Sequence, residues 1–380
     1  MAAQELSMDL PVIDLDVFLA GPAGSEAVIA ECKKAADALI TYGALVLHDS
    51  RVLKEDNETF LDLMEDYFNQ PQEELKKDER PELHYQIGVT LENTEKPKCA
   101  ADEPCLRIIE ALEPSERPLD ITAHSPDPKC RFFWKMNDIP PYETQFPAFN
   151  AANVVPQAEH IKKRWPTTME QWGTSMKNAV ADLADMVSLG LGLPVDFFRN
   201  AGRYGPHLLA PTASDLVKYG KKDTILAGFH SDLNFLTIHG RSRYPGLNIW
   251  ARNTGKRIPV RIPPGNNLLV QAGKQLEHIT GGLIKAGFHE VVVNEQTLAT
   301  IEARKTAFPD RPLIRISSTF FWHLSSDYDL VPISTLLEKA RQLRAEKIQA
   351  GKGDGDEVTY EPMKVGQLVR NELKHIALMA

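Results

Sequence analysis

Short apolar runs separated by Gly, Pro and Asn turns fill the chain between Tyr204 and Trp322. The runs are Thr224–Ala227, Phe235–His239, Gly246–Trp250, Arg257–Ile262, Asn267–Ala272, Phe288–Val293 and Ile314–Phe321. Short strands at this spacing are typical of an all-β sandwich or barrel. We therefore predict a mainly β core over residues 201–330, built as a jelly roll from two packed antiparallel sheets.

Helical patterns flank this predicted core. Apolar positions keep helical spacing after Ser25, and a long amphipathic helix is expected from Thr168 to about Leu189. After Pro332 a further helix is expected, and a last helical segment should run from about Met363 to Ile376. We predict an N-terminal α/β region over residues 1–200 and a C-terminal helical segment over residues 331–380.

The segment from His84 to Met136 is long, irregular, and rich in prolines, aromatic groups and charges. Long irregular segments of compact proteins are often functional loops. We expect this one to fold over the mouth of the core as a lid that governs substrate choice. Its basic groups, such as Arg107, Arg131 and Lys135, suggest a substrate with a carboxylate.

Composition limits the classes of partner. The formal net charge is −9 and basic residues form no dense stripe, which disfavours a nucleic-acid surface. No apolar run approaches the ~18 residues that a membrane helix needs, and no secretory signal is apparent. The four cysteines, Cys32, Cys99, Cys105 and Cys130, show no zinc-type pairing. We expect reduced thiols, a cytoplasmic location, no nucleic-acid or membrane partner, and a monomer as the favoured state.

An imidazole and a carboxylate stand two residues apart in the stretch from Ala227 to His239, where we predict a strand. Because side chains alternate faces along a strand, His230 and Asp232 would point the same way. A hydrogen-bonded pair at a strand end would also explain them. With His289, from a second strand-like run, they would form the two-histidine, one-carboxylate triad of non-haem Fe(II) oxygenases, which leaves coordination positions open.

His278 competes with His289 for the third ligand position. His278 precedes Ile279-Thr280-Gly281-Gly282, so we expect it at the end of a strand, just before a turn. His289 lies inside an alternating strand, on the same face as Val291 and Val293, and that face would look into the barrel. The pattern favours His289.

Arg315 and Ser317 are predicted to share one face of a later strand. The planar fork of arginine donors matches a carboxylate bidentately, and the serine hydroxyl lies two residues on. Such a pair suits a dicarboxylate cosubstrate whose other end chelates the metal.

Several segments together match one family pattern. They are Leu10–Leu15 with Tyr42-Gly43, His230-Ser231-Asp232-Leu233-Asn234-Phe235-Leu236-Thr237, Pro245–Trp250, the run from Gly273 to His289, and Arg315-x-Ser317. In this order they resemble the opening, the His-Thr-Asp segment, the Gly-Leu turn, the run to the second histidine and the Arg-x-Ser of the Fe(II)/2-oxoglutarate-dependent dioxygenases of the isopenicillin N synthase-like family.

The resemblance implies a double-stranded β-helix core that uses Fe(II), 2-oxoglutarate and O₂ to hydroxylate, desaturate or cyclise a small organic substrate. It implies His230, Asp232 and His289 as iron ligands and catalytic residues, with Arg315 and Ser317 binding the distal carboxylate of 2-oxoglutarate. An amino acid or a natural-product intermediate of secondary metabolism is the candidate substrate. Two alternatives remain: an oxidative cyclase that uses no 2-oxoglutarate, and a ligand-binding member without turnover.

The chain departs from the family near the cosubstrate. The family's Asn-Tyr-Tyr-Pro segment, whose tyrosine often assists cosubstrate binding, is replaced by Leu209-Ala210-Pro211-Thr212-Ala213-Ser214. Thr212 and Ser214 are the candidates to take over its role.

We expect the other histidines to be structural. His239 stands at odd parity to His230, so it should face the opposite side of the strand. Glu277 and Glu290, beside the candidate ligands, are expected to face solvent.

Overall fold

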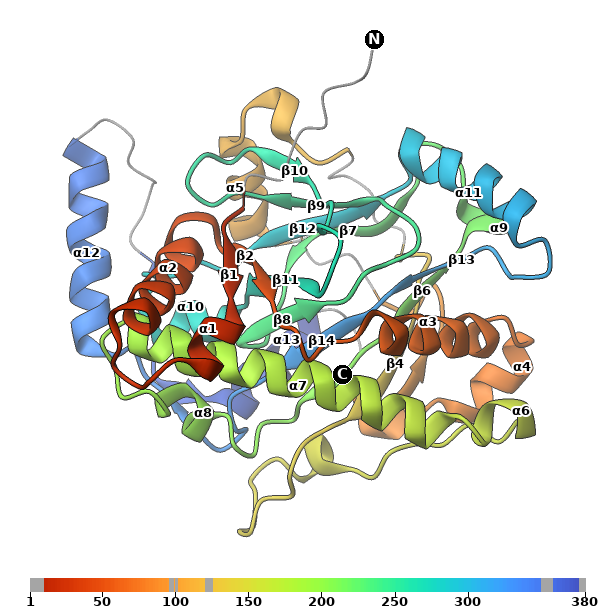
Figure 1. Cartoon of the computed structure of the whole chain (residues 1–380), viewed down its shortest axis with the longest axis horizontal. Coiled ribbons are helices and arrows are strands. Elements are labelled where there is room, and N and C mark those ends of the chain that lie inside the picture. The colour runs from red at the N-terminus through yellow and green to blue at the C-terminus, as the bar shows by residue number, and fades with distance from the viewer. Residues whose placement is uncertain (1–9, 96–98, 100–101, 120–125, 350–357, 376–380) are drawn as a thin grey trace.

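Ten strands form the larger of two facing sheets in the computed structural model of this chain, which describes residues 10–95, 99, 102–119, 126–349 and 358–375 (Figure 1). Its order is β1 (Val12–Asp14), β2 (Ala44–His48), β11 (Asn267–Ala272), β8 (Leu236–His239), β14 (Thr319–Trp322), β5 (Leu208–Leu209), β4 (Cys130–Lys135), β6 (Thr212–Asp215) and β13 (Ile314–Ser317), with β3 (Gly88–Thr90) beside β4. The smaller sheet has the order β10 (Arg257–Pro259), β9 (Leu247–Trp250), β12 (Phe288–Val292) and β7 (Ile225–Ser231). Residues of both sheets line one cavity.

The stretch from Ala227 to His239 is not one strand, so that prediction is wrong. β7 ends at Ser231 and β8 begins at Leu236, and the two strands belong to different sheets. The chain therefore crosses from one sheet to the other between them, and Asp232 lies in the crossing. Counting alternate faces across this break is not valid, because each strand sets its own alternation.

Three helices cover the outer face of the ten-stranded sheet: α2 (Glu26–Tyr42), α3 (Lys54–Phe68) and α7 (Trp165–Gly190). The Ser25 side chain caps α2 by accepting a hydrogen bond from Val28 N, as its position before the apolar run predicts. Gly43, at φ 69°, ends the helix in the left-handed conformation that glycine adopts without strain. The amphipathic helix predicted from Thr168 to about Leu189 is α7, and its apolar stripe is buried: Met169, Trp172, Met176, Val180, Leu183 and Val187.

Side chains along β13 and β14 alternate between the helices and the cavity. Ile316, Phe320 and Trp322 join the hydrophobic core, and the Trp172 indole of α7 donates to Ser318 Oγ at 2.7 Å. The alternate positions line the cavity; they are Arg315, Ser317, Thr319, Phe321 and, just past β14, His323. The core on one side thus fixes the residues that face the cavity on the other.

Strands from the N-terminal region extend the core sheet. β1 pairs in parallel with β2, β2 pairs antiparallel with β11, and β4 pairs with β5 and β6. The other helices are α1 (Leu15–Ala20), α4 (Gln72–Leu75), α5 (Glu103–Ala111), α6 (Glu159–Lys162), α8 (Phe197–Ala201), α9 (Leu216–Tyr219), α10 (Lys274–Ile279), α11 (Glu295–Ala307), α12 (Ser334–Gln349) and α13 (Val365–His375). β15 (Asp329–Leu330) pairs with β16 (Met363–Lys364) just before α13. The domain limits at residues 200 and 330 remain a prediction.

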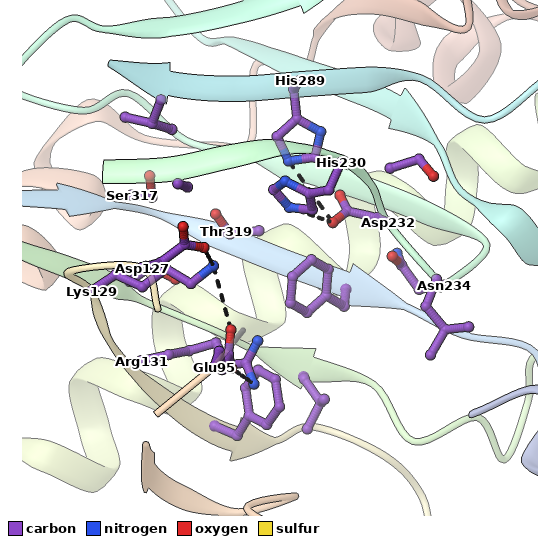
Figure 2. Close-up of a pocket in the computed structure, with 18 of the residues that line it drawn as sticks. Glu95, Asp127, Lys129, Arg131, His230, Asp232, Asn234, His289, Ser317 and Thr319 are labelled. Atoms are coloured by element: carbon purple, nitrogen blue, oxygen red, sulfur yellow. Dashed lines mark hydrogen bonds and ion pairs between the residues drawn. The ribbon is translucent and has the colours of Figure 1, made fainter. Parts of the chain in front are cut away.

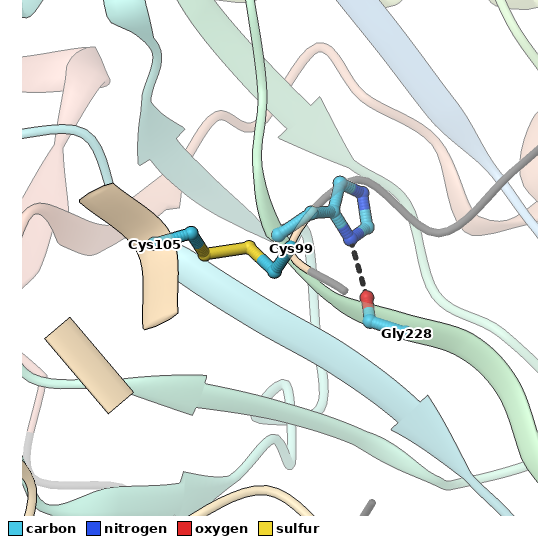
Figure 3. The surroundings of a disulfide bond; sticks show 4 residues. Cys99, Cys105 and Gly228 are labelled. Atoms are coloured by element: carbon cyan, nitrogen blue, oxygen red, sulfur yellow. Dashed lines mark hydrogen bonds between the residues drawn. A yellow bond between two sulfur atoms is a disulfide. The ribbon is translucent and has the colours of Figure 1, made fainter. Parts of the chain in front are cut away.

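The expectation of four reduced cysteines is wrong for one pair, since Cys99 and Cys105 form a disulfide beside β7 (Figure 3). The start of α5 brings the two Cα atoms to 5.3 Å, within disulfide reach. Both cysteines pack on Phe229 and Phe288, on the face of the smaller sheet opposite to His230 and His289. Spacing alone could not reveal this shared burial. No described helix has the length and apolarity to span a bilayer.

Candidate active site

His230, Asp232 and His289 come together on the cavity wall (Figure 2). His230 of β7 and His289 of β12 stand directly opposite in the antiparallel register, with ring centroids 4.2 Å apart. Oδ1 of Asp232 lies 3.8 Å from Nε2 of His230 and 3.9 Å from Nε2 of His289. One ligand atom from each residue therefore lies within 4.8 Å of the other two.

Neighbouring groups orient two of these side chains. Nδ1 of His230 donates to the carbonyl of Gly228 at 2.6 Å, which directs Nε2 toward the triad. The Thr237 hydroxyl donates to Oδ2 of Asp232 at 2.7 Å and leaves Oδ1 for the histidine side. Metal ligands in proteins are commonly held by such outer partners, which fix the tautomer and the direction of the donor atoms.

Burial favours the neutral form of both imidazoles. It lowers the pKa of His230 well below its usual value, and it also lowers the pKa of His289. Burial alone would raise the pKa of Asp232, but the positive charge that His289 or His230 carries when protonated and the Thr237 hydrogen bond outweigh it and hold that pKa below its usual value. Two neutral imidazoles and one carboxylate are the protonation states that metal binding requires, and this donor set fits Fe(II).

Arg315 is buried in the same cavity with no ion-pair partner among the described residues. Its Nη1 donates to Ser317 Oγ at 2.9 Å, and its Nε donates to the Pro245 carbonyl at 3.4 Å. Burial lowers the pKa of Arg315 to about 10, so the group stays charged at neutral pH. Thr212 and Ser214 lie opposite Ser317 and Arg315 in the β6–β13 register and also line the cavity.

The prediction that His278 lies at a strand end is wrong, because His278 lies in α10. The spacing of the apolar residues around it is too short to distinguish one helical turn from a strand. The structure groups His289, and not His278, with His230 and Asp232.

His239 faces the cavity, so its predicted orientation is wrong. On β8 it shares a face with Thr237, and its ring centroid lies 6.2 Å from that of His289. The break between β7 and β8 explains the error, because parity counted from His230 does not continue past Asp232. Its Nδ1 lies 3.2 Å from Thr319 Oγ1.

The two glutamates beside the candidate ligands do not face solvent. Glu290 is buried on the other face of β12 and accepts a hydrogen bond from Asn248 Nδ2 at 3.2 Å. Glu277 is half-buried and accepts hydrogen bonds from Ala286 N at 2.7 Å and the Tyr360 hydroxyl at 2.9 Å. Both serve the packing around α10 and β12.

The segment from 84 to 136 forms one wall of the cavity, as far as the structure describes it. Its charged groups there are largely paired: Lys129 Nζ lies 2.8 Å from Asp127 Oδ2 and 3.4 Å from Glu95 Oε2, and Arg131 pairs with Glu95 (Figure 2). Asp127 also accepts a hydrogen bond from Gly228 N at 3.2 Å, which ties this wall to β7 beside His230. The segment's role as a substrate-covering lid remains a prediction.

Sequence reasoning missed the part of the cavity wall that α13 supplies. Val369, Glu372 and Leu373 line the cavity, while Val369 and Leu373 also pack with Phe146 and Phe149. The i, i+4 spacing of Val369 and Leu373 signals a packed helical face, although it cannot say which surface that face meets. The cavity encloses about 200 Å³.

Residues 199–324 match the family model described as the 2OG-Fe(II) oxygenase superfamily, and this range contains all five predicted site residues. Among curated proteins, the chain is 27% identical over 143 residues to the peptide transporter imqJ of Aspergillus flavus (37% of this chain, 26% of that protein). It is 25% identical over 163 residues to azadirone synthase LFS of Melia azedarach (40% and 47%). The matched stretches thus span less than half of these relatives.

Solved structures establish the fold over nearly the whole chain. A full-length protein of Neurospora crassa, solved in complex with alpha-KG and thymine, superposes with a TM-score of 0.66 at 19% identity and covers 98% of both chains. This likeness confirms the predicted mainly β, jelly-roll core with helices on both sides. The family match confirms the resemblance at the level of the superfamily: residues 199–324 of this chain form a 2OG-Fe(II) oxygenase domain.

Proposed function

We propose that this protein is an enzyme, a non-haem Fe(II)/2-oxoglutarate-dependent dioxygenase that oxidises a small organic substrate. The observation that carries the proposal is a buried Arg315 without a carboxylate partner among the described residues, in the cavity that also holds the triad. A buried, unpaired charge is costly, so its retention is explained by an anionic ligand. Alpha-KG, a ligand of the Neurospora crassa structure, is such a dianion.

His230, Asp232 and His289 would hold Fe(II), which with 2-oxoglutarate and O₂ supplies the oxidising power for attack on a C–H bond. The remaining tasks belong to the chain. Arg315 and Ser317 bind and orient the distal carboxylate of 2-oxoglutarate, with Thr212 and Ser214 close enough to assist them. Thr237 keeps Asp232 in place. Apolar lining residues such as Phe321 exclude water from the reacting centre.

The test measures succinate formation and oxygen uptake with Fe(II), with and without 2-oxoglutarate, against a panel of small organic substrates. The proposal expects succinate formation that requires both Fe(II) and 2-oxoglutarate. Oxidation of a substrate without 2-oxoglutarate would favour the oxidative-cyclase alternative. Absence of all turnover and of 2-oxoglutarate binding would favour a non-catalytic member.

The finer assignments belong to the same proposal. We infer membership of the isopenicillin N synthase-like subgroup and a role in secondary metabolism from the sequence motifs alone. We also propose a cytoplasmic location, a monomeric state and a small-molecule partner, the last supported by the size of the cavity. Cell fractionation and size-exclusion chromatography with light scattering test the first two.

A further inference from the structure

A second buried cation, Lys135, faces the cavity. On β4 the alternation of side chains points Arg131, Phe133 and Lys135 inward, while Phe132 and Trp134 join the hydrophobic core. Lys135 is 8% exposed, and its Nζ donates a hydrogen bond to the carbonyl of Phe149. That bond uses one of the three ammonium donors.

Lys135 differs from the other lysine and arginine residues on this wall. Lys129 and Arg131 are paired with Asp127 and Glu95. Among the described residues no carboxylate forms an ion pair with Lys135, and burial without an opposing charge lowers its pKa to about 7. A buried ammonium without an ion-pair partner lowers stability. A neutral donor could bind the Phe149 carbonyl equally well, so that hydrogen bond does not explain why the residue here is a lysine.

Lys135 and Arg315 lie toward opposite ends of the cavity. Arg131 pairs with Thr212 across β4 and β6, and Thr212 pairs with Ser317 across β6 and β13. This row of paired residues lies next to Arg315 and marks one end of the cavity. Lys135 lies four residues further along β4, roughly 13 Å away at the rise of a β-strand. Its own row runs through Leu208 and Phe321 to Thr237, whose hydroxyl holds Asp232.

The surroundings of Lys135 suit the organic part of a ligand. Phe133, Leu208 and Phe321 form an apolar cluster on the cavity wall. His323 follows them on the same face, and burial, with the nearby charge of Lys135, lowers the pKa of this histidine to about 3, so it is neutral. A ligand in this half of the cavity therefore meets one cation, apolar side chains and a neutral imidazole, and α13, which packs on Phe149, adds Glu372 to the cavity wall.

We propose that Lys135 binds an anionic group of the substrate, so that the cavity holds two anions at once: 2-oxoglutarate at Arg315 and an organic acid with an apolar body at Lys135. This inference rests on the proposed function and adds the substrate class and the residue that recognises it. The row of paired residues that contains Lys135 ends at Thr237 beside Asp232, whereas Arg315 pairs with Ser214 in a different row, so the two anions would bind at separate positions in the cavity.

The test measures binding by calorimetry under anaerobic conditions, with Fe(II) and saturating 2-oxoglutarate. The probes are matched pairs of an acid and its amide: phenylacetate and phenylacetamide, 3-phenylpropanoate and its amide, and indole-3-acetate and its amide. At pH 6.5 we expect at least one acid to bind about 30-fold or more tightly than its amide, as for a buried charge pair. Equal affinity for every acid and its amide would overturn the proposal.

Two variants test the residue. Lys135→Met keeps the apolar stem, and Lys135→Gln keeps a donor for the Phe149 carbonyl without the charge; both should lose the preference for the acid. If Lys135→Gln retains that preference, the proposal is wrong. Lys305→Met is the matched control, because Lys305 is an exposed lysine of α11 outside the cavity; it should keep the preference.

A reciprocal variant separates this inference from the proposed function. Arg315→Met should lose 2-oxoglutarate affinity and keep the acid preference, whereas Lys135→Met should keep 2-oxoglutarate affinity, which also shows that it folds. If instead Lys135→Met loses 2-oxoglutarate affinity and Arg315→Met loses the acid preference, Lys135 binds the cosubstrate and the proposal is overturned. If both variants still bind 2-oxoglutarate and the acid preference still depends on Lys135, the proposed function is contradicted but the role of Lys135 is not.

Discussion

The hydroxyl of Thr237 donates a 2.7 Å hydrogen bond to Oδ2 of Asp232 and thereby turns Oδ1 toward the two histidines. Thr237 lies on β8 of the larger sheet, while His230 and His289 lie on the smaller one. Asp232, which lies where the chain passes between the sheets, is thus held by β8 of the larger sheet and completes the group of ligand atoms on the smaller sheet.

Thr237→Val should weaken Fe(II) binding by ~10–100-fold, the range measured for partners of metal ligands. Valine keeps the shape of threonine and removes the hydroxyl that contacts both Asp232 Oδ2 at 2.7 Å and Asn234 Oδ1 at 3.0 Å. Anaerobic metal titration measures the effect, with Thr59→Val, an exposed position on α3, as the matched control. An unchanged affinity in Thr237→Val would mean that Asp232 needs no orientation from β8.

His289→Ala should abolish iron-dependent turnover and weaken metal binding, because it removes one of three grouped ligand atoms. His278→Ala should leave the metal bound, since His278 lies in α10 and is not part of that group. Metal content after dialysis, compared between the two variants, provides the measurement. A metal-free His278→Ala protein beside an active His289→Ala protein would contradict the assigned ligand set.

Arg315→Ala should weaken 2-oxoglutarate binding by about 30-fold or more, because loss of one partner of a buried charge pair costs ~2–5 kcal/mol. Apparent affinities for 2-oxoglutarate and for the substrate are measured in parallel. If only the substrate affinity falls and 2-oxoglutarate proves dispensable, Arg315 binds the substrate and the cosubstrate assignment fails.

Lys135→Met should raise the free energy of unfolding at neutral pH, because it removes a buried charge without an ion-pair partner. The pKa of Lys135 falls from 10.5 to about 7 on folding. Between pH 7 and pH 10.5 the unfolded chain therefore binds more protons at Lys135 than the folded chain does. In this range Lys135 makes the free energy of unfolding rise with pH, by at most ~1.4 kcal/mol per pH unit. The gain from Lys135→Met is therefore largest at and below pH 7 and vanishes toward pH 10.5.

Urea denaturation of both proteins at pH 6.5, 8 and 9.5 measures this difference. His323 lies near Lys135, and its pKa of about 3 keeps it neutral across this range. A gain that is constant with pH would show that Lys135 keeps its proton in the folded protein.

The sequence motifs were sufficient to predict which candidate site residues share one cavity, because His230, His289 and Arg315 each lie inside one regular strand where alternation is reliable. His239 was misplaced because the chain changes sheets between β7 and β8, and no local signal marks that crossing. α13 was expected as a helix, but its contact with the cavity depends on packing between residues more than 200 positions apart in the chain. The disulfide was not predicted because it too depends on packing: Cys99 and Cys105 are brought together on a shared apolar surface, which the cysteine spacing does not reveal.

The most direct test of the account is the dependence of 2-oxoglutarate binding on Fe(II), measured by calorimetry without oxygen. The triad and Arg315 lie in one cavity, so a dianion that chelates the metal and pairs with Arg315 should bind much more tightly with Fe(II) than without it. Asp232→Ala should remove this difference and leave only the weaker binding at Arg315. Equal 2-oxoglutarate affinity with and without Fe(II) in the unaltered protein would contradict the shared site.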